Sequence, residues 1–212
     1  MIGGEDTVKQ IEGVTYKLLS CAKNEFLKKG FKDASLRIIA ENANTSTSSI
    51  YTRFKDKAGL FNAIVKSAAD NFYQRYQEEL DIFDKMVPMD WNKMLDYTDN
   101  QQNLLIDMIY DDFSAFKLLV CHAEGTVFSD FINNVVEYDV AYTIKYIESI
   151  GNDAIVSKRL TPELLHILCS SYWSGIFEIV VHDMSKEDAN IYISRLKRFF
   201  RCGWQDIFST TD

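Results

Sequence analysis

The spacing of the apolar residues is the feature that most restricts the folds open to this chain. Across most of its 212 residues, apolar side chains recur three or four positions apart, which places them on one face of an α-helix. They seldom alternate with polar residues as half-buried strands require. Only 2 prolines and 9 glycines interrupt the pattern. It predicts an all-α protein, in which a small three-helix head is joined by a long helix to a helical bundle.

The first two helices of the head are marked by stop and start signals. An apolar stripe covers about residues 7–29, and Gly30 supplies the left-handed conformation that ends a helix. The hydroxyl of Ser35 can accept an amide hydrogen from the following turn, so Ser35 is predicted to cap a short helix over residues 36–42. Asn44 then lies at a tight turn, because asparagine tolerates the left-handed conformation.

A third helix is predicted to follow, with Ser46 as its cap. Its first turn carries only small hydroxyl side chains, while Ile50 and Phe54 are spaced four apart on the face to be buried. Such a helix can enter the major groove of DNA by its N-terminus, as the recognition helix of a helix-turn-helix does. Residues 1–57 are therefore predicted to form a DNA-binding domain, and residues 58–212 a second domain.

The second domain is predicted to begin with a long helix that Asp56 caps and whose apolar stripe reaches Leu80. Further helices are predicted over about residues 103–122, 128–150, 162–182 and 186–207, with loops around a short helix between residues 81 and 101. The helix over 162–182 is apolar almost all round, which indicates burial against more than its own domain. A dimer interface through the last two helices would explain this, and a deep intramolecular core is the alternative.

A net charge of −8 would disfavour DNA binding if it were spread evenly, but it is distributed unequally along the chain. Residues 1–60 carry 10 Lys and Arg against 7 Asp and Glu, whereas residues 61–212 carry 13 against 24. Phosphate contacts need positive charge only on the docking face, so a mildly basic head on an acidic body is compatible with DNA binding.

Cysteine spacing and hydropathy indicate the cellular compartment. The chain contains no run of about 18 consecutive apolar residues and no secretion signal, so we expect a cytoplasmic protein with no membrane partner. Its four cysteines lie far apart and form no CxxC pair, so buried free thiols are expected and not a zinc site or a disulfide framework. They are Cys21, Cys121, Cys169 and Cys202.

The continuous segment from Ser35 to Leu60 resembles the DNA-binding head of the TetR family of transcriptional regulators. The matching positions are Leu36, Ile39, Ala40, Ala43, Ser46, Ile50, Tyr51, Phe54, Lys57 and Leu60, preceded by a helix that ends in Lys29-Gly30-Phe31. The resemblance covers about residues 8–65. It departs from the family at Asn44, where Gly is frequent, and at Ser48, where Gly or Ala is frequent.

The resemblance implies a homodimeric repressor that binds a palindromic double-stranded DNA operator and is released when a small molecule binds the second domain. The predicted DNA contacts are Ser35, Arg37, Ser46, Thr47, Ser48, Ser49, Tyr51, Thr52, Arg53 and Lys57. Residues 47–49 are placed to meet base edges, and Arg37 to reach a guanine or a phosphate, with a solvated arginine as the alternative. By resemblance, Tyr51 and Lys57 clamp phosphates, and Arg53 is expected to contact phosphate beside them.

The second domain holds 23 of the 28 aromatic residues. Core packing is the expected role of each one alone, but together they suggest a pocket for an apolar or aromatic effector, as the resemblance also implies. The candidate pocket residues are Tyr76, Tyr110, Phe113, His122, Tyr142, Trp173 and Phe177. No cofactor and no metal site is predicted.

Two other classes of function remain open. An enzyme could use histidines such as His166 or the Asp111-Asp112 pair, but the chain has no phosphate-binding glycine loop and no nucleophile elbow. His166 and Cys169 share a helix face, yet two ligands do not make a metal site. The third class is a helical small-molecule-binding or interaction protein that retains the head without a specific operator.

Overall fold

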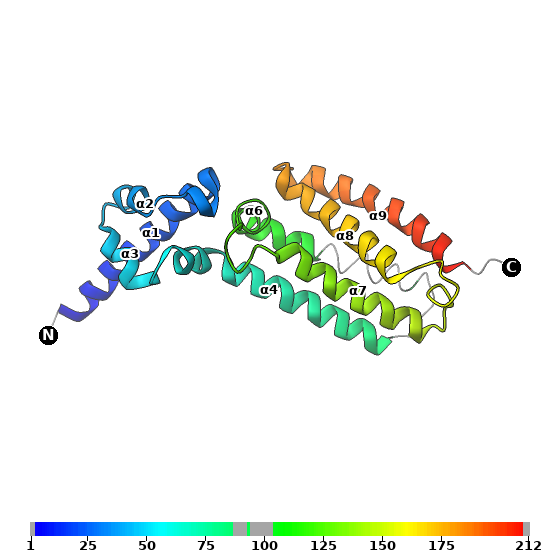
Figure 1. Cartoon of the computed structure of the whole chain (residues 1–212). Helices are drawn as coiled ribbons and strands as arrows, with labels where there is room; N and C mark the ends of the chain where they lie inside the picture. The colour runs from blue at the N-terminus through cyan, green and yellow to red at the C-terminus, as the bar shows by residue number, and fades with distance from the viewer. Residues whose placement is uncertain (1–2, 87–92, 94–103, 210–212) are drawn as a thin grey trace. The chain divides into compact units, whose positions relative to one another are not determined.

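The fold is seen in a computed structural model, which describes residues 3–86, 93 and 104–209 (Figure 1). All regular elements among these residues are helices, which confirms the predicted all-α class. In chain order they are α1 (Gly3–Asp33), α2 (Leu36–Asn42), α3 (Thr47–Phe54), α4 (Lys57–Met86), α6 (Phe113–Cys121), α7 (Phe131–Ser149), α8 (Pro162–Val181) and α9 (Lys186–Phe208), with a further helical stretch over 104–111. Most of the predicted loop region between residues 81 and 101 lies outside the described residues.

Both left-handed positions predicted in the head are confirmed. Gly30 has a φ of 73° and kinks α1, so that three further helical residues follow the kink. Asn44 has a φ of 53° in the turn between α2 and α3. Asparagine reaches this conformation more readily than other residues with a side chain, so a glycine is not required there.

The predicted caps at Ser35 and Asp56 are confirmed, whereas the one at Ser46 is not. The hydroxyls of Ser35, Thr161 and Ser185 accept amide hydrogens of α2, α8 and α9, and the carboxylate of Asp56 accepts the Gly59 N–H at 2.7 Å. Ser46 has the extended backbone of a cap, but its hydroxyl forms no capping hydrogen bond, so its predicted role as a side-chain cap is wrong.

A single helix predicted over residues 103–122 is in fact broken at Asp112. Residues 104–111 are helical, Asp112 leaves the helical conformation with φ −137° and ψ 60°, and its carboxylate accepts the Ala115 N–H at 3.2 Å. Aspartate competes for backbone amides in this way and so favours the start of a new helix over continuation of the old one. The new helix is α6.

The chain divides into two compact units. Unit 1 comprises residues 1–70 and 112–129, and unit 2 comprises residues 71–111 and 130–212. In unit 1, α6 and the loop after it pack on α1 through the Phe31 N–H, which donates to the His122 carbonyl at 3.1 Å, and through an ion pair between Lys32 and Glu124. The predicted boundary after residue 57 is a division by function, which this packing does not test.

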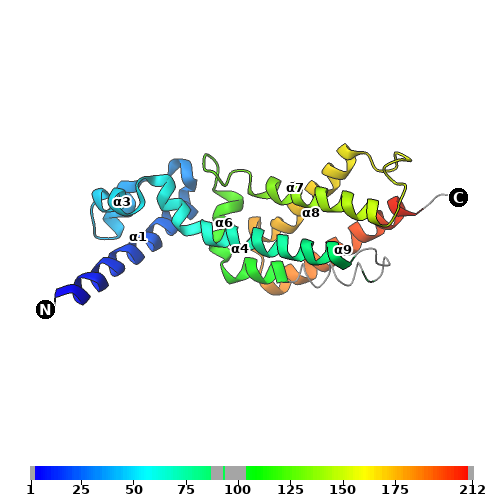
Figure 2. The ribbon, with the colours of Figure 1, turned by 90° about the horizontal axis from the view of Figure 1, so that it is seen from below.

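Each unit has its own aromatic core. In unit 1 the rings of Phe26 and Phe61 meet edge to face with their centroids 5.1 Å apart. In unit 2, α8 packs against α7 and α9 (Figures 1 and 2). The ring of Phe131 there lies 5.7 Å from that of Phe72 and 5.6 Å from that of Phe177, measured between centroids.

The expectation of buried thiols holds only for Cys169. Cys21 is half-buried, while Cys121 and Cys202 are exposed on α6 and α9. The helix faces that carry Cys121 and Cys202 are turned outward, which spacing along the chain does not reveal.

Helix α8 is long and apolar enough, by length and composition, to cross a membrane. Only 39% of its most apolar window is buried within the chain. A core helix of a soluble protein passes the same test, and α8 packs against α7 and α9.

Candidate nucleic-acid interface

The recognition helix α3 presents its N-terminus outward. Ser46 and Ser48 are exposed, Thr47 and Ser49 are half-buried, and Ile50 is fully buried beneath them. The turn before α3 is held by the Thr45 N–H, which donates to the Ala40 carbonyl at 2.9 Å. Small side chains at an exposed helix N-terminus allow the backbone to approach base edges closely.

Tyr51 stands out from the same face, with 55% of its surface exposed. Its neighbour Thr52 is also exposed and donates its hydroxyl hydrogen to the Ser48 carbonyl at 2.9 Å. A tyrosine so exposed, beside a helix N-terminus, has a phenol hydroxyl well suited to a phosphate oxygen.

Arg53 connects α3 with α1. Its guanidinium donates to the Thr15 hydroxyl at 3.1 Å, to the Ser49 carbonyl at 3.2 Å and to the Ser49 hydroxyl at 2.5 Å. These bonds orient the recognition helix, which is a role that the sequence did not predict. A guanidinium carries five N–H donors, so the predicted phosphate contact of Arg53 stays a prediction.

Lys57 has an internal role as well. Its ammonium donates to the carbonyls of Lys32 and Ala34, each at 2.8 Å, and lies 5.1 Å from the centre of the Phe31 ring. Burial lowers the pKa of Lys57, although the negative charges of Asp33 and Glu25 oppose the shift. Two of the three ammonium hydrogens thus hold the C-terminal end of α1 against the start of α4.

Glu25 is a residue of the interface scaffold that sequence reasoning missed. It is buried, and its carboxylate accepts the Ser35 N–H at 3.2 Å, which fixes the residue that caps α2. Its position on α1 next to Phe26, within the buried stripe, is the signal that could have revealed it.

Gly59 allows α3 and α4 to meet directly. A Cβ atom on Gly59 would lie 1.9 Å from the Phe54 carbonyl oxygen, far inside van der Waals contact. Lys55 between the two helices has a φ of 72°, which makes the turn tight. The start of α4, and with it Lys57, is therefore fixed against the end of the recognition helix.

The other two predicted contacts lie at the start of α2. Arg37 is highly exposed and pairs with Glu41 one turn later, at a distance of 3.6 Å. The Ser35 hydroxyl accepts the Ile38 N–H at 3.5 Å. An exposed ion pair of this kind is weak enough for Arg37 to exchange Glu41 for a phosphate or a base.

The structure brings three of the seven predicted pocket residues into contact. The rings of Tyr76 and Phe177 lie 5.1 and 6.1 Å from that of Trp173 in unit 2. Tyr110 donates to the Met184 carbonyl at 3.0 Å, and Tyr142 donates to the Asp81 carboxylate at 2.6 Å. The remaining two, Phe113 and His122, belong to unit 1. A shared effector pocket stays a prediction.

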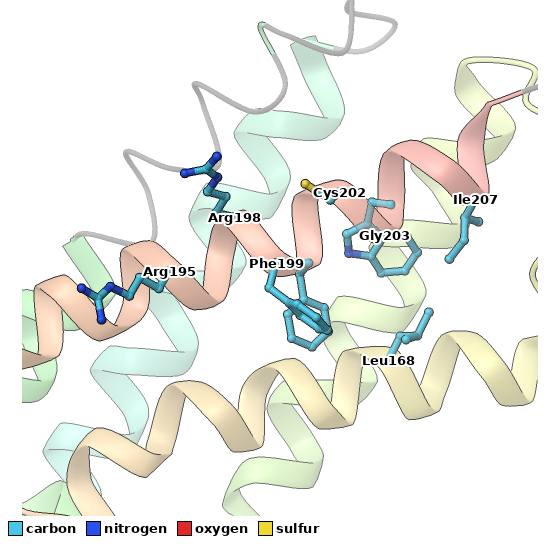
Figure 3. A pocket seen from close by; sticks show the side chains of 9 residues that line it. Leu168, Arg195, Arg198, Phe199, Cys202, Gly203 and Ile207 are labelled. Atoms are coloured by element: carbon cyan, nitrogen blue, oxygen red, sulfur yellow. The ribbon is translucent and has the colours of Figure 1, made fainter.

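A groove of about 620 Å³ lies along α8 and α9 (Figure 3). Its lining includes Leu168, Phe199, Trp204 and Ile207, and it contains none of the seven predicted pocket residues. Phe199 has 75% of its surface exposed here.

Comparison with known proteins agrees with the geometry of the head. Residues 18–64 match the family model for bacterial regulatory proteins of the tetR family. An uncharacterized HTH-type transcriptional regulator of Bacillus subtilis (strain 168), YvkB, is 22% identical over 185 residues, which span 85% of this chain and 88% of that protein.

Among solved structures, a chain from Mesorhizobium loti assigned to the TetR-family transcriptional regulators is similar in fold. Its TM-score is 0.52 at 15% identity, and the match covers 90% of this chain and 96% of that one. The matched segment contains the turn, the exposed recognition helix and the start of α4 described above. The head of this chain, over residues 18–64, is therefore the part that matches the tetR family of bacterial regulatory proteins, and the chain as a whole is similar to HTH-type transcriptional regulators.

Proposed function

We propose that the protein is a cytoplasmic homodimeric repressor, which binds a palindromic operator and leaves it when a small molecule binds unit 2. The observation that carries the proposal is the outward N-terminus of α3, with Tyr51 exposed beside it and Arg53 and Lys57 fixing its orientation. Two recognition helices about 34–36 Å apart would meet successive major grooves.

The proposed DNA contacts divide by role. Thr47, Ser48 and Ser49 read base edges or thymine methyl groups, because short side chains let α3 enter the groove deeply. Tyr51 binds a phosphate, as Thr52 and Arg53 do from the positions directly after it, and Lys57 uses its third ammonium hydrogen for another. Ser35, Arg37 and Ser46 contact the backbone on either side.

The proposed dimer interface consists of α8 and α9. Five large apolar residues are exposed on these helices, namely Leu164, Ile167, Val181, Ile191 and Phe199. One of the five, Phe199, also lines the groove of Figure 3. Apolar area of this extent on a monomer is typical of a subunit interface, and pairing with a second copy would remove it from water.

Binding of the protein to DNA from upstream of its own gene tests the function. Anisotropy titrations at two salt concentrations should show a specific complex whose affinity falls steeply with salt, as phosphate contacts require. Tyr51→Phe should weaken the complex roughly tenfold, because a hydrogen bond to a charged phosphate is lost. Tyr16→Phe is the matched control, since Tyr16 is 76% exposed on α1 and is not one of the predicted DNA contacts.

A failure to form any specific complex would contradict the repressor function. It would favour the alternative of a helical binding protein that retains the head without an operator. A complex that Tyr51→Phe and Tyr16→Phe leave equally strong would contradict the proposed phosphate contact but not the function.

A further inference from the structure

Asp139 on α7 places an ionisable group within the aromatic core of unit 2. The Tyr76 hydroxyl of α4 donates to its Oδ1 at 2.9 Å, and the Cys169 thiol of α8 donates to the same carboxylate. The Trp173 indole N–H, also on α8, lies close enough to lower the pKa of Asp139. Two helices, α4 and α8, therefore direct three polar hydrogens at one carboxylate on α7.

One hydrogen-bond donor of this cluster has no acceptor within it. The indole N–H of Trp173 is the buried side-chain donor, within the described part of the chain, that forms no hydrogen bond of regular geometry. Buried polar groups in folded proteins nearly always have a partner, so an exception calls for an explanation. A rearrangement of the carboxylate around a bound group would give the indole an acceptor.

The carboxylate also lacks a positive partner. Desolvation raises the pKa of Asp139, and its negative charge helps to raise the pKa values of Tyr76 and Cys169. The side chains that the structure shows acting on this carboxylate, namely Tyr76, Cys169 and Trp173, are all neutral. Asp139 is half-buried, and an acid withdrawn from water without a cation is costly, whereas an asparagine could accept the same hydrogen bonds at lower cost.

A second tyrosine–aspartate pair on the same two helices shows the usual arrangement. Tyr142 donates to Asp81, which is exposed, and the charges of Lys85 and Lys145 help to lower the pKa of Asp81. The surface pair thus has two cations beside it and the inner pair has none.

Aromatic rings lie next to the groups that hold the inner carboxylate. The ring of Trp173 lies 5.1 Å from that of Tyr76 and 6.3 Å from that of Phe72, measured between centroids. The faces of aromatic rings attract cations, most strongly in surroundings without water. A carboxylate with aromatic neighbours has the chemistry to bind an organic ammonium or a comparable cation.

We propose that Asp139, Tyr76 and Trp173 form the binding site for the positively charged group of an organic cation, which is the effector of this regulator. The inference rests on the proposed function and changes the expected ligand from an apolar molecule to an aromatic or alkyl cation. Because Tyr76 and Trp173 are buried, the ligand can enter only when these side chains move. Binding therefore favours a different packing of α4, α7 and α8, which is what a ligand must do to change DNA affinity.

The test uses two ions of the same shape and opposite charge, tetraphenylphosphonium and tetraphenylborate, titrated calorimetrically into the full chain without DNA. A smaller pair, phenyltrimethylammonium and its neutral isostere tert-butylbenzene, covers a narrower site. Asp139→Asn is the test variant, and Asp81→Asn is the matched control because it alters the exposed tyrosine–aspartate pair. Circular dichroism and thermal unfolding establish that both variants fold.

At least one cation should bind the wild type and Asp81→Asn equally, and Asp139→Asn about 10- to 100-fold more weakly, as loss of a charged partner implies. The negatively charged or neutral counterpart of that cation should bind each of the three proteins no more tightly than the cation binds the wild type. Equal cation affinity for wild type and Asp139→Asn, or no cation binding at all, would overturn the proposal.

A separate titration of the protein–DNA complex with the same cation distinguishes the two proposals. Cation binding that depends on Asp139 but leaves the DNA complex intact would support the site and contradict ligand-controlled repression. Release of DNA by the neutral counterpart, without dependence on Asp139, would support ligand control and overturn the cation site.

Discussion

Glu25 in unit 1 and Asp139 in unit 2 are both acidic side chains directed into the protein. Glu25 accepts the Ser35 N–H, and its charge acts on Lys57, whose ammonium closes the end of α1. Asp139 accepts hydrogen bonds only from neutral groups, and burial raises its pKa. The acid of the head is thus part of a scaffold whose charges balance. The acid of the body has a charge that the chain itself does not balance, which suits a region that must respond to a ligand.

The prediction with the largest expected effect tests whether the two units unfold separately. Phe61→Ala removes a buried ring from unit 1 and should lower its free energy of unfolding by about 3–5 kcal/mol. All three tryptophans lie in residues 71–212, so tryptophan fluorescence reports on unit 2 alone. We expect helical circular dichroism to show a new early transition while the fluorescence midpoint stays in place. A joint shift of both signals would show that the units unfold as one.

Lys57→Met tests the balanced scaffold of the head. Loss of the ammonium leaves the carbonyls of Lys32 and Ala34 without their donor, so we expect unit 1 to lose about 2 kcal/mol of stability. Lys55→Met is the matched control, because Lys55 carries the same charge on the exposed turn before α4. Circular dichroism melts compare the two variants. Equal stability would mean that Lys57 acts only on DNA.

Asp139→Asn should make the body more stable in the absence of ligand, by about 1–2 kcal/mol near neutral pH, because a charge withdrawn from water is removed. The folded-state pKa of Asp139 lies above the ordinary 3.8, so the stability that its protonation provides is lost as pH rises through that folded-state pKa. Asparagine does not titrate, so its advantage should grow as the pH rises from the ordinary pKa of 3.8 through the raised folded-state pKa. Urea unfolding followed by tryptophan fluorescence measures it, and an advantage independent of pH would contradict the raised pKa.

The smallest predicted effect is the difference in stability loss between alanine substitutions at Ser35 and at Ser46, the two serines at helix starts in the head. Ser35→Ala should cost about 1 kcal/mol, because the hydroxyl caps α2, whereas Ser46→Ala should cost nearly nothing, because its hydroxyl forms no cap. Thermal melts of the two variants make the comparison directly. A larger cost at Ser46 would show that its hydroxyl caps α3 in solution.

The sequence by itself determined what depends on neighbours within a few positions. The helical class, the left-handed Gly30 and Asn44, the caps at Asp56, Thr161 and Ser185, and the register of the recognition helix all follow from hydrogen bonds or side-chain spacing inside a single turn or helix. The break at Asp112 is equally local, but apolar periodicity continues through it and conceals it.

The tertiary structure alone decided which distant groups meet. Spacing along a helix shows that a residue lies on an inner face, but not what approaches that face from elsewhere in the chain. The attachment of α6 to α1, the use of Arg53 and Lys57 as internal ties, and the outward turn of Cys121 depend on such long-range packing. So does the position of Asp139 among Tyr76, Cys169 and Trp173, because its three partners come from two other helices.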